Sequence, residues 1–382
     1  MLQKVFLKKS IFYLNNTRFC DKVSIENQSC NILFKKGFFM NRSIIYFPEK
    51  EKAVFETAEA DATLAPNQVL VKIDYDLISA GTELANYHDL PNTEVSIRKF
   101  PHYPGYTTSG HIVKIGDAVK KYKIGDRVVC AWGGHRSWVI REENDRIYPV
   151  PEGIDQKDAA AAHLASFPML AIRKLQIQMG EACLIAGQGL LGLIAGQLAR
   201  IAGAYPVIVS DCSPERRELA LQLGADYALD PMAPDYVEKV IQLTDGRGPE
   251  TVVEVTGNIQ ALQQVLECVA KNGRVVLLGC TRISDQPINV YKYIHCKGVY
   301  LIGAHTSNRP AHDPAHWGAS EADDYKSFFK YLKSGRLKVS SLISEVASPR
   351  EADAIYQKIG MSANPPLGIL LNWTDIDNDI PR

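Results

Sequence analysis

The chain has 382 residues, of which 46% are hydrophobic and 23% are charged, a composition typical of a soluble globular protein with about two domains. Lysine plus arginine and aspartate plus glutamate number 43 each, so the overall charge favours neither nucleic acid nor an anionic membrane as a partner. The longest apolar stretch, residues 184–205, is interrupted by glutamine, arginine and glycine, so we expect no transmembrane helix. The cysteines are scattered without a C-x-x-C pair, which favours reduced thiols and a cytoplasmic location over a disulfide framework.

Residues 1–39 differ from the rest of the chain. They are rich in Lys, Asn, Phe and Ile, and an orderly strand pattern begins only at a second methionine, Met40. Three interpretations compete: a misassigned start codon, a genuine but loosely ordered extension, or a transit peptide. The last is the least favoured, because the basic residues are mostly lysine and the segment contains Asp21 and Glu26.

Residues 40–167 are predicted to form an all-β domain, plausibly a small barrel. Short runs of β-branched and aromatic residues are separated there by Gly, Pro, Asn and Asp. The runs are at residues 43–47, 68–78, 110–116, 126–132 and 137–141.

Residues 168–306 have a different pattern, in which strands alternate with longer helical segments. This βαβ rhythm is typical of a parallel sheet covered on both faces. Within it, an apolar strand is followed by a Gly-x-Gly-x-x-Gly motif, a helix, and a second strand that ends at Asp211. Such a motif is weak evidence alone, but this context is the one that dinucleotide binding requires.

Each residue of the motif has a distinct role in binding a dinucleotide. Gly187 allows the tight strand-to-helix turn, Gly189 lets the pyrophosphate approach the backbone, and Gly192 lets the helix lie close to the sheet. Leu190 belongs to the helix N-terminus, whose amides and dipole face the phosphates. The carboxylate of Asp211 can accept hydrogen bonds from the adenosine ribose, which favours NAD over NADP.

Two further features bear on the cofactor. Arg216 and Arg217 lie near enough to Asp211 to weaken the preference for NAD, although we favour their interpretation as solvated residues on a helix opened by a Ser-Pro pair. A second strand-helix-strand pattern spans residues 251–279 and places Gly257 and Gly279 at strand ends, where the nicotinamide half is expected.

Residues 307–382 are predicted to contribute a helix, a strand, a helix and a last strand, at 323–337, 341–347, 349–360 and 367–373. These elements are expected to return to the first domain.

One segment of this region, residues 308–324, looks inserted, and it is a candidate cover for the substrate pocket or an oligomer contact. Its His312 and His316 have the i, i+4 spacing of a metal-binding pair. The proline between them breaks the helix that this spacing requires, so we expect a loop.

The order of these elements resembles the medium-chain dehydrogenase/reductase family over residues 40–373. The most specific similarities are the glycine motif with Asp211, "GDRVV" at 125–129 and "RVVLLG" at 274–279. The resemblance implies an α/β fold with a GroES-like β-barrel catalytic domain and a Rossmann domain built on a doubly wound parallel sheet. It also implies a homodimer or homotetramer.

Zinc members of this family bind their catalytic metal through a Cys in a "CGTD"-like motif, a His in a "GHE"-like motif, and a third Cys or Glu before the Rossmann domain. The matching positions here are Ala80, Tyr106 and Ser166, none of which is an ordinary zinc ligand. The cysteines of the family's structural zinc lobe are missing too. The resemblance therefore implies a zinc-free branch with no metal site, in which a side chain moves the proton and NAD carries the hydride.

Three side chains are candidates for the proton transfer. The hydroxyl of Tyr106 could act as general acid or base, or its ring could simply fill the space of the zinc. Thr82 matches the hydroxyl that relays the alcohol proton in zinc relatives, or it satisfies backbone groups at a turn. His135 follows two glycines at a strand turn expected to face the cleft, where it could shuttle protons. Glu83, beside Thr82, is interpreted as a supporting group.

The function predicted from the sequence is a zinc-independent, NAD-dependent dehydrogenase acting on a secondary alcohol, or the matching ketone, of a small polar molecule such as a sugar, cyclitol or polyol. Asn86, Ser166 and His305 are the candidate substrate-binding residues of the hydrogen-bonding pocket. Two alternatives remain open: a zinc-free quinone or enoyl reductase using NAD(P)H, and an NAD-binding protein without turnover.

Overall fold

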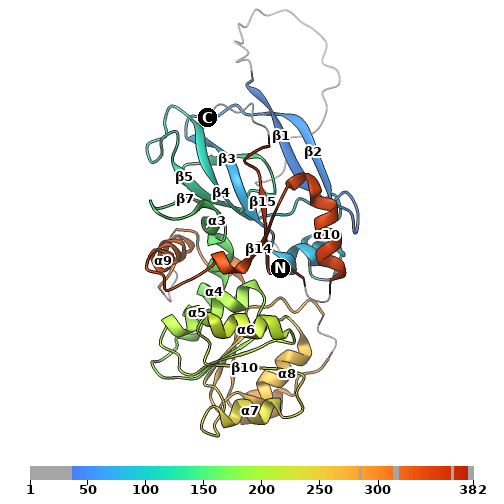
Figure 1. Cartoon of the computed structure of the whole chain (residues 1–382), viewed down its shortest axis with the longest axis vertical. Helices are drawn as coiled ribbons and strands as arrows, with labels where there is room; N and C mark the ends of the chain where they lie inside the picture. The colour runs from blue at the N-terminus through green and yellow to red at the C-terminus, as the bar shows by residue number, and fades with distance from the viewer. Residues whose placement is uncertain (1–36, 284–285, 313–317, 363–364, 377–382) are drawn as a thin grey trace, which may run out of the picture. The chain divides into compact units, whose positions relative to one another are not determined.

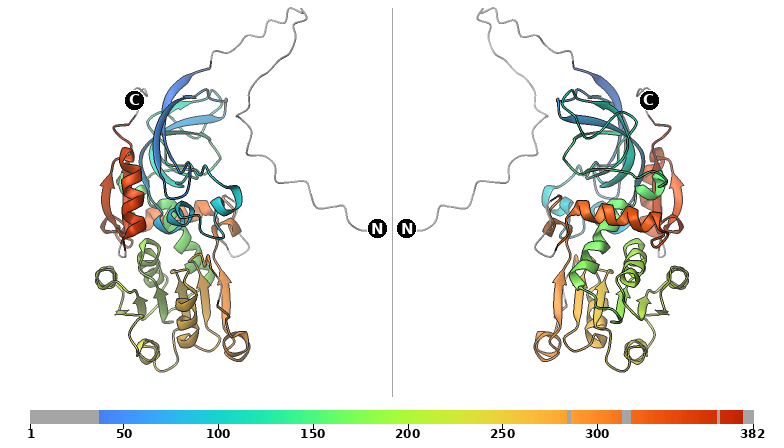
Figure 2. Two further views of the ribbon diagram at one scale, coloured as in Figure 1. Left: turned by 90° about the vertical axis from the view of Figure 1, so that its right-hand side faces the viewer. Right: turned by 90° about the vertical axis from the view of Figure 1, so that its left-hand side faces the viewer.

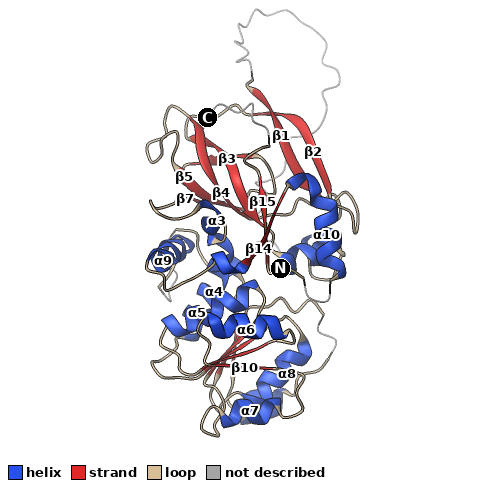
Figure 3. Cartoon of the chain, viewed as in Figure 1, coloured by secondary structure: helices blue, strands red, loops and turns tan. Residues whose placement is uncertain are grey.

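The computed structural model describes residues 37–283, 286–312, 318–362 and 365–376 (Figure 1). The interpretations of residues 1–36 and the prediction for His316 therefore lie outside the described residues. Residues from Phe38 onward form one compact unit, and within it the strands and helices form two regions (Figure 3).

The first region is a largely antiparallel sheet with strand order β14-β15-β3-β4-β5-β7, in which β6 also pairs with β3. Its strands are β3 (Gln68–Leu77), β4 (Thr107–Ile115), β5 (Arg127–Ala131), β6 (Trp138–Glu142), β7 (Ile147–Pro149), β14 (Ile343–Ala347) and β15 (Gly368–Asn372). A separate antiparallel hairpin is formed by β1 (Phe39–Tyr46) and β2 (Val54–Asp61). The sheet follows from the alternating β-branched and aromatic runs, which bury one face of each strand.

Elements far apart in the sequence complete this sheet. β15 pairs antiparallel with β3, and β14 pairs parallel with β15. Helix α10 (Ala352–Met361) lies beside the first strands of the chain in both views of Figure 2, and the backbone amide of Ala53 donates to its Asp353 at 3.1 Å. The C-terminal segment therefore joins the β region.

The second region is a six-stranded parallel sheet with order β10-β9-β8-β11-β12-β13. In chain order this is the 3-2-1-4-5-6 arrangement of a doubly wound sheet. Its strands are β8 (Cys183–Ala186), β9 (Val207–Ser210), β10 (Tyr227–Leu229), β11 (Thr251–Glu254), β12 (Arg274–Leu277) and β13 (Tyr300–Gly303). The α/β fold with a parallel sheet, as predicted from the sequence, is confirmed.

Helices cover both faces of the parallel sheet because alternate strand residues point to opposite sides. Ile185, Val209, Val253 and Val276 pack on one side, with α4 (Ala162–Leu175), α5 (Leu190–Ile201) and α9 (Glu321–Lys333). Their neighbours Leu184, Ile208, Val252 and Val275 pack on the other, with α7 (Tyr236–Gln242) and α8 (Ile259–Cys268). The strands are buried on both sides, which explains why they read as continuous apolar runs.

Shorter helices lie where sequence signals place them. The predicted Ser-Pro start is confirmed for α6 (Pro214–Gln222), since the Ser213 side chain accepts a hydrogen bond from the amide of Arg216. The remaining α-helices are α1 (Ala80–Tyr87), α2 (Glu94–Arg98) and α3 (Gln156–Ala159). The predicted domain boundary at residue 168 falls inside α4, because Pro168 is accommodated within that helix.

Gly110, in the middle of β4, lies directly against β3. A Cβ atom at this position would lie 2.0 Å from the backbone oxygen of Lys72. Because two paired strands cannot separate locally without losing ladder hydrogen bonds, we expect Gly110→Ala to lower the free energy of unfolding by about 1–3 kcal/mol in urea denaturation. Gly303→Ala on the edge strand β13, where a Cβ meets nothing within 4 Å, is the matched control and should change it by less than about 0.5 kcal/mol. Equal losses in the two variants would contradict this steric explanation.

Candidate active site

A cleft of about 1290 Å³ is lined by both regions of the fold. The β region contributes α1 with the residues before it, the segment 102–106 and Trp132. The parallel sheet contributes the residues that follow the carboxyl ends of β8, β9, β11, β12 and β13. Ligands of doubly wound sheets bind at this end of the strands, so the cleft is the candidate active site.

The glycine motif forms the floor of the cleft where β8 turns into α5. Gly187 has a φ of +98°, which other residues rarely adopt, and a Cβ on Gly192 would lie 1.9 Å from the oxygen of Gly187. At Gly189, the N-cap of α5, a Cβ would meet nothing within 4 Å, so the helix N-terminus is open to the cleft. The motif therefore fits a pyrophosphate, whose charge the free amides and the helix dipole stabilise.

Asp211 lines the cleft just after β9. Its Oδ2 accepts a hydrogen bond from the amide of Gln188 at 2.7 Å, and its Oδ1 accepts one from the amide of Ser213 at 2.8 Å. Each carboxylate oxygen has a second lone pair, so both can also accept a hydrogen bond from a ribose hydroxyl.

The two neighbouring arginines differ in position. The guanidinium of Arg217 donates to the backbone oxygens of Asp211 at 2.7 Å and Cys212 at 3.1 Å. Arg216 lines the cleft and donates to the oxygen of Pro365 at 3.0 Å. Both arginines lie on the predicted helix and are partly exposed, and Arg216 in addition contacts the C-terminal segment across the cleft.

Gly257 and Gly279, which the sequence predicts at the nicotinamide half of a dinucleotide site, both line the cleft. A Cβ on Gly279 would lie 2.3 Å from the amide nitrogen of Gly257, so the ends of β11 and β12 lie in direct contact there.

The three positions that hold zinc in metal-dependent relatives are not brought together. Ala80, at the start of α1, and Tyr106, before β4, both line the cleft. Ser166 is fully buried and does not line it, whereas Leu164 and Phe167 do. Those two residues are three apart and share one face of α4, so Ser166 points elsewhere. The prediction that Ser166 binds substrate is wrong for this reason.

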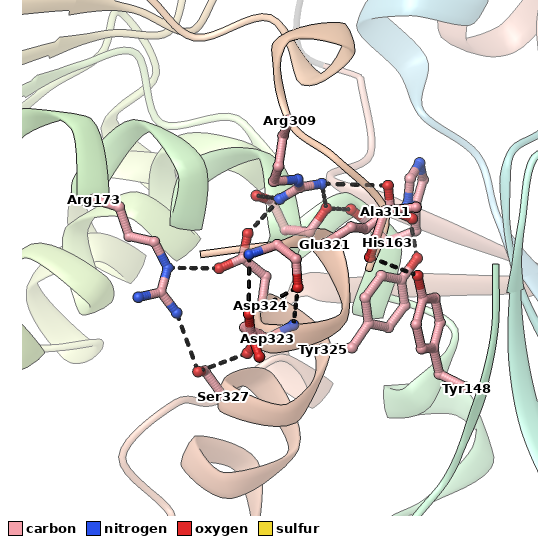
Figure 4. A network of polar contacts seen from close by, with 12 residues as sticks. Tyr148, His163, Arg173, Arg309, Ala311, Glu321, Asp323, Asp324, Tyr325 and Ser327 are labelled. Carbon is pink, nitrogen blue, oxygen red and sulfur yellow. Dashed lines mark hydrogen bonds and ion pairs between the residues drawn. The ribbon is translucent and has the colours of Figure 1, made fainter. Parts of the chain in front are cut away.

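Ser166 belongs instead to a buried polar network between α4 and α9. Figure 4 shows other members of this network, among them His163, Arg309 and Asp324. Its Oγ accepts a hydrogen bond from Arg309 at 3.0 Å, and its backbone oxygen accepts another at 3.0 Å. Arg309 also pairs with Asp324, which accepts from the Nε of Arg173 at 2.7 Å. The His163 ring contacts the Tyr325 hydroxyl at 2.7 Å. The described part of the 308–324 segment therefore fastens α9 to α4.

Tyr106 is nearly buried at the cleft wall. Its hydroxyl donates a hydrogen bond to the Oγ of Ser79. Its ring lies against those of Trp132 and Phe167, with centroids 5.2 and 5.8 Å away, and meets His163 edge-on at 5.7 Å. Burial raises the pKa of Tyr106, and the hydroxyls of Ser79 and Thr82 offset this only in part. Tyr106 is therefore a phenol, not a phenolate, at neutral pH.

Ser79 and Thr82 lie beside Tyr106 at the start of α1 and line the cleft. Ser79 was not predicted from the sequence; its only signal is that it immediately precedes the "AGTE" motif. Together these residues form a cluster of hydroxyl groups, which we call the hydroxyl cluster (Ser79, Thr82 and Tyr106). Such groups can donate a proton or a hydrogen bond to a substrate oxygen.

His135 does not line the cleft, so the prediction that it faces the substrate is wrong. It is 1% exposed and lies between two carboxylates: Nδ1 is 2.9 Å from Oδ2 of Asp76, and Nε2 is 2.9 Å from Oε2 of Glu83. Burial alone would lower the pKa of His135, but these carboxylates raise it from 6.5 to about 10. His135 is a buried cation at neutral pH.

The ion cluster of Asp76, Glu83 and His135 holds the hydroxyl cluster in place. Oε1 of Glu83 accepts a hydrogen bond from the amide of Ser79 at 2.8 Å. Its Oε2 accepts another from the hydroxyl of Tyr356 on α10, and Oδ2 of Asp76 accepts one from the indole of Trp373 at 2.9 Å. Glu83 thus has the supporting position that its sequence suggested.

The remaining substrate-binding candidates, Asn86 and His305, both line the cleft. The amide of Asn86 donates to the oxygen of Thr82 at 3.0 Å and accepts from the amide of Val95 at 3.1 Å, so it joins α1 to α2. His305 is exposed, and its Nδ1 accepts from the amide of Ser307 at 3.2 Å, so in a neutral ring Nε2 is the donor.

The residues at the zinc positions do not fit that metal, since a methyl group, a phenol and a remote buried hydroxyl are not zinc ligands. Within the described ranges, no group of three or more His, Cys, Asp or Glu side chains is arranged to hold a metal ion. His312 contacts the backbone oxygen of Asn144 at 2.7 Å.

No helix in the same ranges is long and apolar enough to span a membrane.

Comparisons with known proteins agree with this architecture. Residues 65–154 match the alcohol dehydrogenase GroES-like domain, and residues 191–317 match the zinc-binding dehydrogenase family. The L-threonine 3-dehydrogenase of Pyrococcus horikoshii is 34% identical over 246 residues, 56% of this chain and 69% of that protein. The D-guloside 3-dehydrogenase of Escherichia coli strain K12 is 27% identical over 256 residues, 66% of this chain and 72% of that protein.

The crystal structure of 2R,3R-butanediol dehydrogenase from Bacillus subtilis has the same fold, with a TM-score of 0.72 and 20% identity over 87% of this chain and 99% of that one. The fold and the cleft thus define an oxidoreductase with a GroES-like and a Rossmann-type domain. The chain belongs to the medium-chain dehydrogenase/reductase family, among the alcohol and polyol dehydrogenase-like proteins.

The charge of His135 should be essential for stability. His135→Gln leaves Asp76 and Glu83 buried together without a cation, so we expect the free energy of unfolding at pH 7 to fall by about 3–5 kcal/mol. His88→Gln, which removes a partly exposed ring 3.1 Å from Glu51, is the control and should cost less than about 1 kcal/mol.

The same variant predicts a pH dependence. Because folding raises the pKa of His135 from 6.5 to about 10, its stabilisation is fully present below pH 6.5 and is lost as the pH rises through about 10. The difference between wild type and His135→Gln in urea denaturation should narrow over that range. A difference that stays constant up to pH 11 would rule out a buried imidazolium.

Proposed function

We propose that the protein is a zinc-independent, NAD-dependent dehydrogenase that transfers a hydride between the nicotinamide and a secondary alcohol or ketone of a polar substrate such as a sugar, cyclitol or polyol. One observation carries the proposal: a single cleft contains the glycine turn with Asp211 and, on the β region, the hydroxyl cluster, which includes Tyr106 and lies beside Ala80. The relatives named above, which are dehydrogenases of a guloside, of threonine and of a diol, support a substrate with hydroxyl groups.

NAD, when bound, supplies the hydride acceptor. The residues fit it as follows: the amides at the N-terminus of α5 would bind the pyrophosphate, and the carboxylate of Asp211 would accept hydrogen bonds from the adenosine ribose. Neither Gly257 nor Gly279 places a side chain at the end of the cleft where the nicotinamide would lie. The carboxylate of Asp211 would repel the 2′-phosphate of NADP, whereas the guanidinium group of Arg216 would attract it.

The hydroxyl cluster supplies the proton. Tyr106 donates its hydrogen to Ser79 Oγ, so the hydrogen of Ser79 is available for a substrate oxygen in the cleft. In ketone reduction, the proton passes from Ser79 to the carbonyl oxygen, Tyr106 passes its own proton to Ser79, and solvent in the cleft returns a proton to Tyr106. Because burial raises the pKa of Tyr106, the relay is in its protonated form at neutral pH, and the base form that alcohol oxidation needs is populated only at alkaline pH, where oxidation should be faster.

The aromatic wall of the cleft favours one alternative. Trp132, Phe167 and Leu164 present apolar surface beside the hydroxyl cluster, which also suits a quinone or an enone reduced by NADPH. Measuring NADPH oxidation with quinones and enones, in parallel with the polar alcohols, distinguishes the two functions.

Tyr106→Phe tests the relay. Since the variant keeps the ring and removes the proton, we expect kcat for a polar alcohol or its ketone to fall by about 10²-fold or more, with a small change in KM. NADH formation would be followed with a panel of sugars, inositols and polyols, and zinc would be quantified in the same samples. Tyr122→Phe, which removes a hydroxyl bonded to the oxygen of Ile147 at 2.9 Å outside the cleft, is the matched control. Full activity of Tyr106→Phe, or activity proportional to bound zinc, would refute the relay.

Asp211→Asn tests the cofactor assignment. Replacing the carboxylate removes a charged acceptor for the ribose, so we expect the Kd for NADH to rise about tenfold, equivalent to about 1.4 kcal/mol, and the preference for NADH over NADPH to narrow. The fluorescence of bound NADH and NADPH measures both affinities. Asp230→Asn, at a surface ion pair with Arg217, controls for the loss of a carboxylate. Unchanged NADH affinity in Asp211→Asn would contradict the assignment.

A further inference from the structure

A second, smaller pocket of about 220 Å³ lies in the β region and shares one residue, Trp132, with the cleft. Three arginines line it: Arg42 on β1, Arg136 between β5 and β6, and Arg141 on β6. A bridge between Ile44 and Arg136 joins β1 to the loop and brings these side chains together. We call this the arginine pocket.

The positive charge of the arginine pocket is not neutralised by the residues around it. The charged or ionisable side chains that affect the pKa of Arg42 and Arg136 are other arginines and Tyr103, with no carboxylate of the described residues among them. Asp61 also lines the pocket, but its Oδ1 accepts from the amide of Thr63 at 2.8 Å and it lies within 4.0 Å of no arginine in the described ranges. The pocket therefore has three positively charged guanidinium groups and one solvent-exposed carboxylate, that of Asp61.

The arginines are also short of hydrogen-bond acceptors. The Nε atoms of Arg136 and Arg141 are buried and have no partner among the residues that the structure describes. Arg141 is fixed by one bond to the oxygen of Ala131 at 2.7 Å, and the guanidinium of Arg42 lies over the ring of Trp138 at 5.0 Å. Leaving buried donors unpaired is costly, so the arrangement is that of a site prepared for an acceptor.

Local backbone geometry keeps Arg136 in this position. Gly134 has a φ of +76°, and a Cβ there would lie 2.5 Å from a terminal nitrogen of Arg136. Burial, followed by the repulsion of Arg42 and Arg141, lowers the pKa of Arg136 to about 10, so the side chain remains charged at neutral pH. A bound anion would relieve both effects.

We propose that the arginine pocket binds a phosphate-type oxyanion. Planar guanidinium groups with several N–H donors match the oxygens of phosphate, which can accept from all three arginines at once. A pocket of about 220 Å³ is smaller than the usual 300–1,000 Å³ of a site for a complete ligand, which suits a single anionic group. The group is either free inorganic phosphate or the phosphoryl end of a substrate whose remainder extends past Trp132.

This inference does not rest on the dehydrogenase proposal, since binding can be measured without turnover. The thermal unfolding of the full chain would be followed with increasing inorganic phosphate, at constant ionic strength set with chloride. We expect a saturable rise of the Tm, by about 5 °C at about 100-fold excess over the Kd. Phosphate also stabilises proteins by exclusion from their surface, which gives a rise that does not saturate.

Variants separate these effects. Arg136→Gln should abolish the saturable rise without lowering the Tm in chloride, because it removes a repelled charge. Arg42→Gln, which also removes a pocket arginine, should weaken the phosphate affinity at least tenfold. It replaces Arg136→Gln as the test variant if Arg136→Gln does not fold. Arg247→Gln, an exposed arginine on the Rossmann-type region, should respond as the wild type. A rise that does not saturate, or one that both pocket variants retain, would overturn the proposal.

A last comparison distinguishes the source of the phosphate. If the group belongs to a substrate, a hexitol phosphate should bind at least tenfold more tightly than inorganic phosphate, and Arg136→Gln should abolish that difference. If the pocket holds free phosphate, the two affinities should be equal. Both results support an oxyanion site, and neither depends on whether the hexitol phosphate is oxidised.

Discussion

The candidate active site depends on one buried imidazolium, that of His135, held between Asp76 and Glu83. The three groups come from β3, from α1 and from the connection between β5 and β6, and their remaining hydrogen-bond partners Tyr356 and Trp373 come from the C-terminal segment. Each hydrogen bond to a buried charge offsets part of the cost of removing it from water. The cluster therefore requires both ends of the β region to be in place before α1 can hold Ser79 and Thr82 at the cleft.

This arrangement explains why the C-terminal segment returns to the first region. Pairing of β15 with β3 would suffice to complete the sheet. Trp373, one residue beyond β15, and Tyr356, on α10, add hydrogen bonds to the two carboxylates that sit under the hydroxyl cluster. The position of the hydroxyl cluster thus depends on residues more than 270 positions away in the sequence, as in the contact of Tyr356 with Glu83.

Features that depend on neighbours in the chain were predictable from the sequence, and those that depend on distant partners were not. The glycine turn and Asp211 lie within 25 residues of one another, and a strand-turn-helix unit places them without further information. His135 looked like a cleft residue because its two carboxylate partners are 59 and 52 positions earlier. Ser166 was misplaced because the packing of α4 on α9, and not its position in the motif, decides which way it points. Ser79 was missed because its position before the "AGTE" motif was its only signal, and the arginine pocket had none, since its arginines are scattered in the sequence and meet only in the fold.

Trp132 has a backbone φ of +59° and a side chain that is 44% exposed. The left-handed conformation costs a residue with a Cβ about 1–2 kcal/mol, yet it places one indole in the walls of both the cleft and the arginine pocket. A residue shared by the walls of two sites can couple them only if a ligand at one site changes the position of that residue. If an anion changes the orientation of this ring and thereby the affinity of the cleft for its ligand, the cleft ligand must change the affinity for the anion by the same factor. The strained tryptophan thus provides the fold with a physical route for communication between a reacting molecule and an ion.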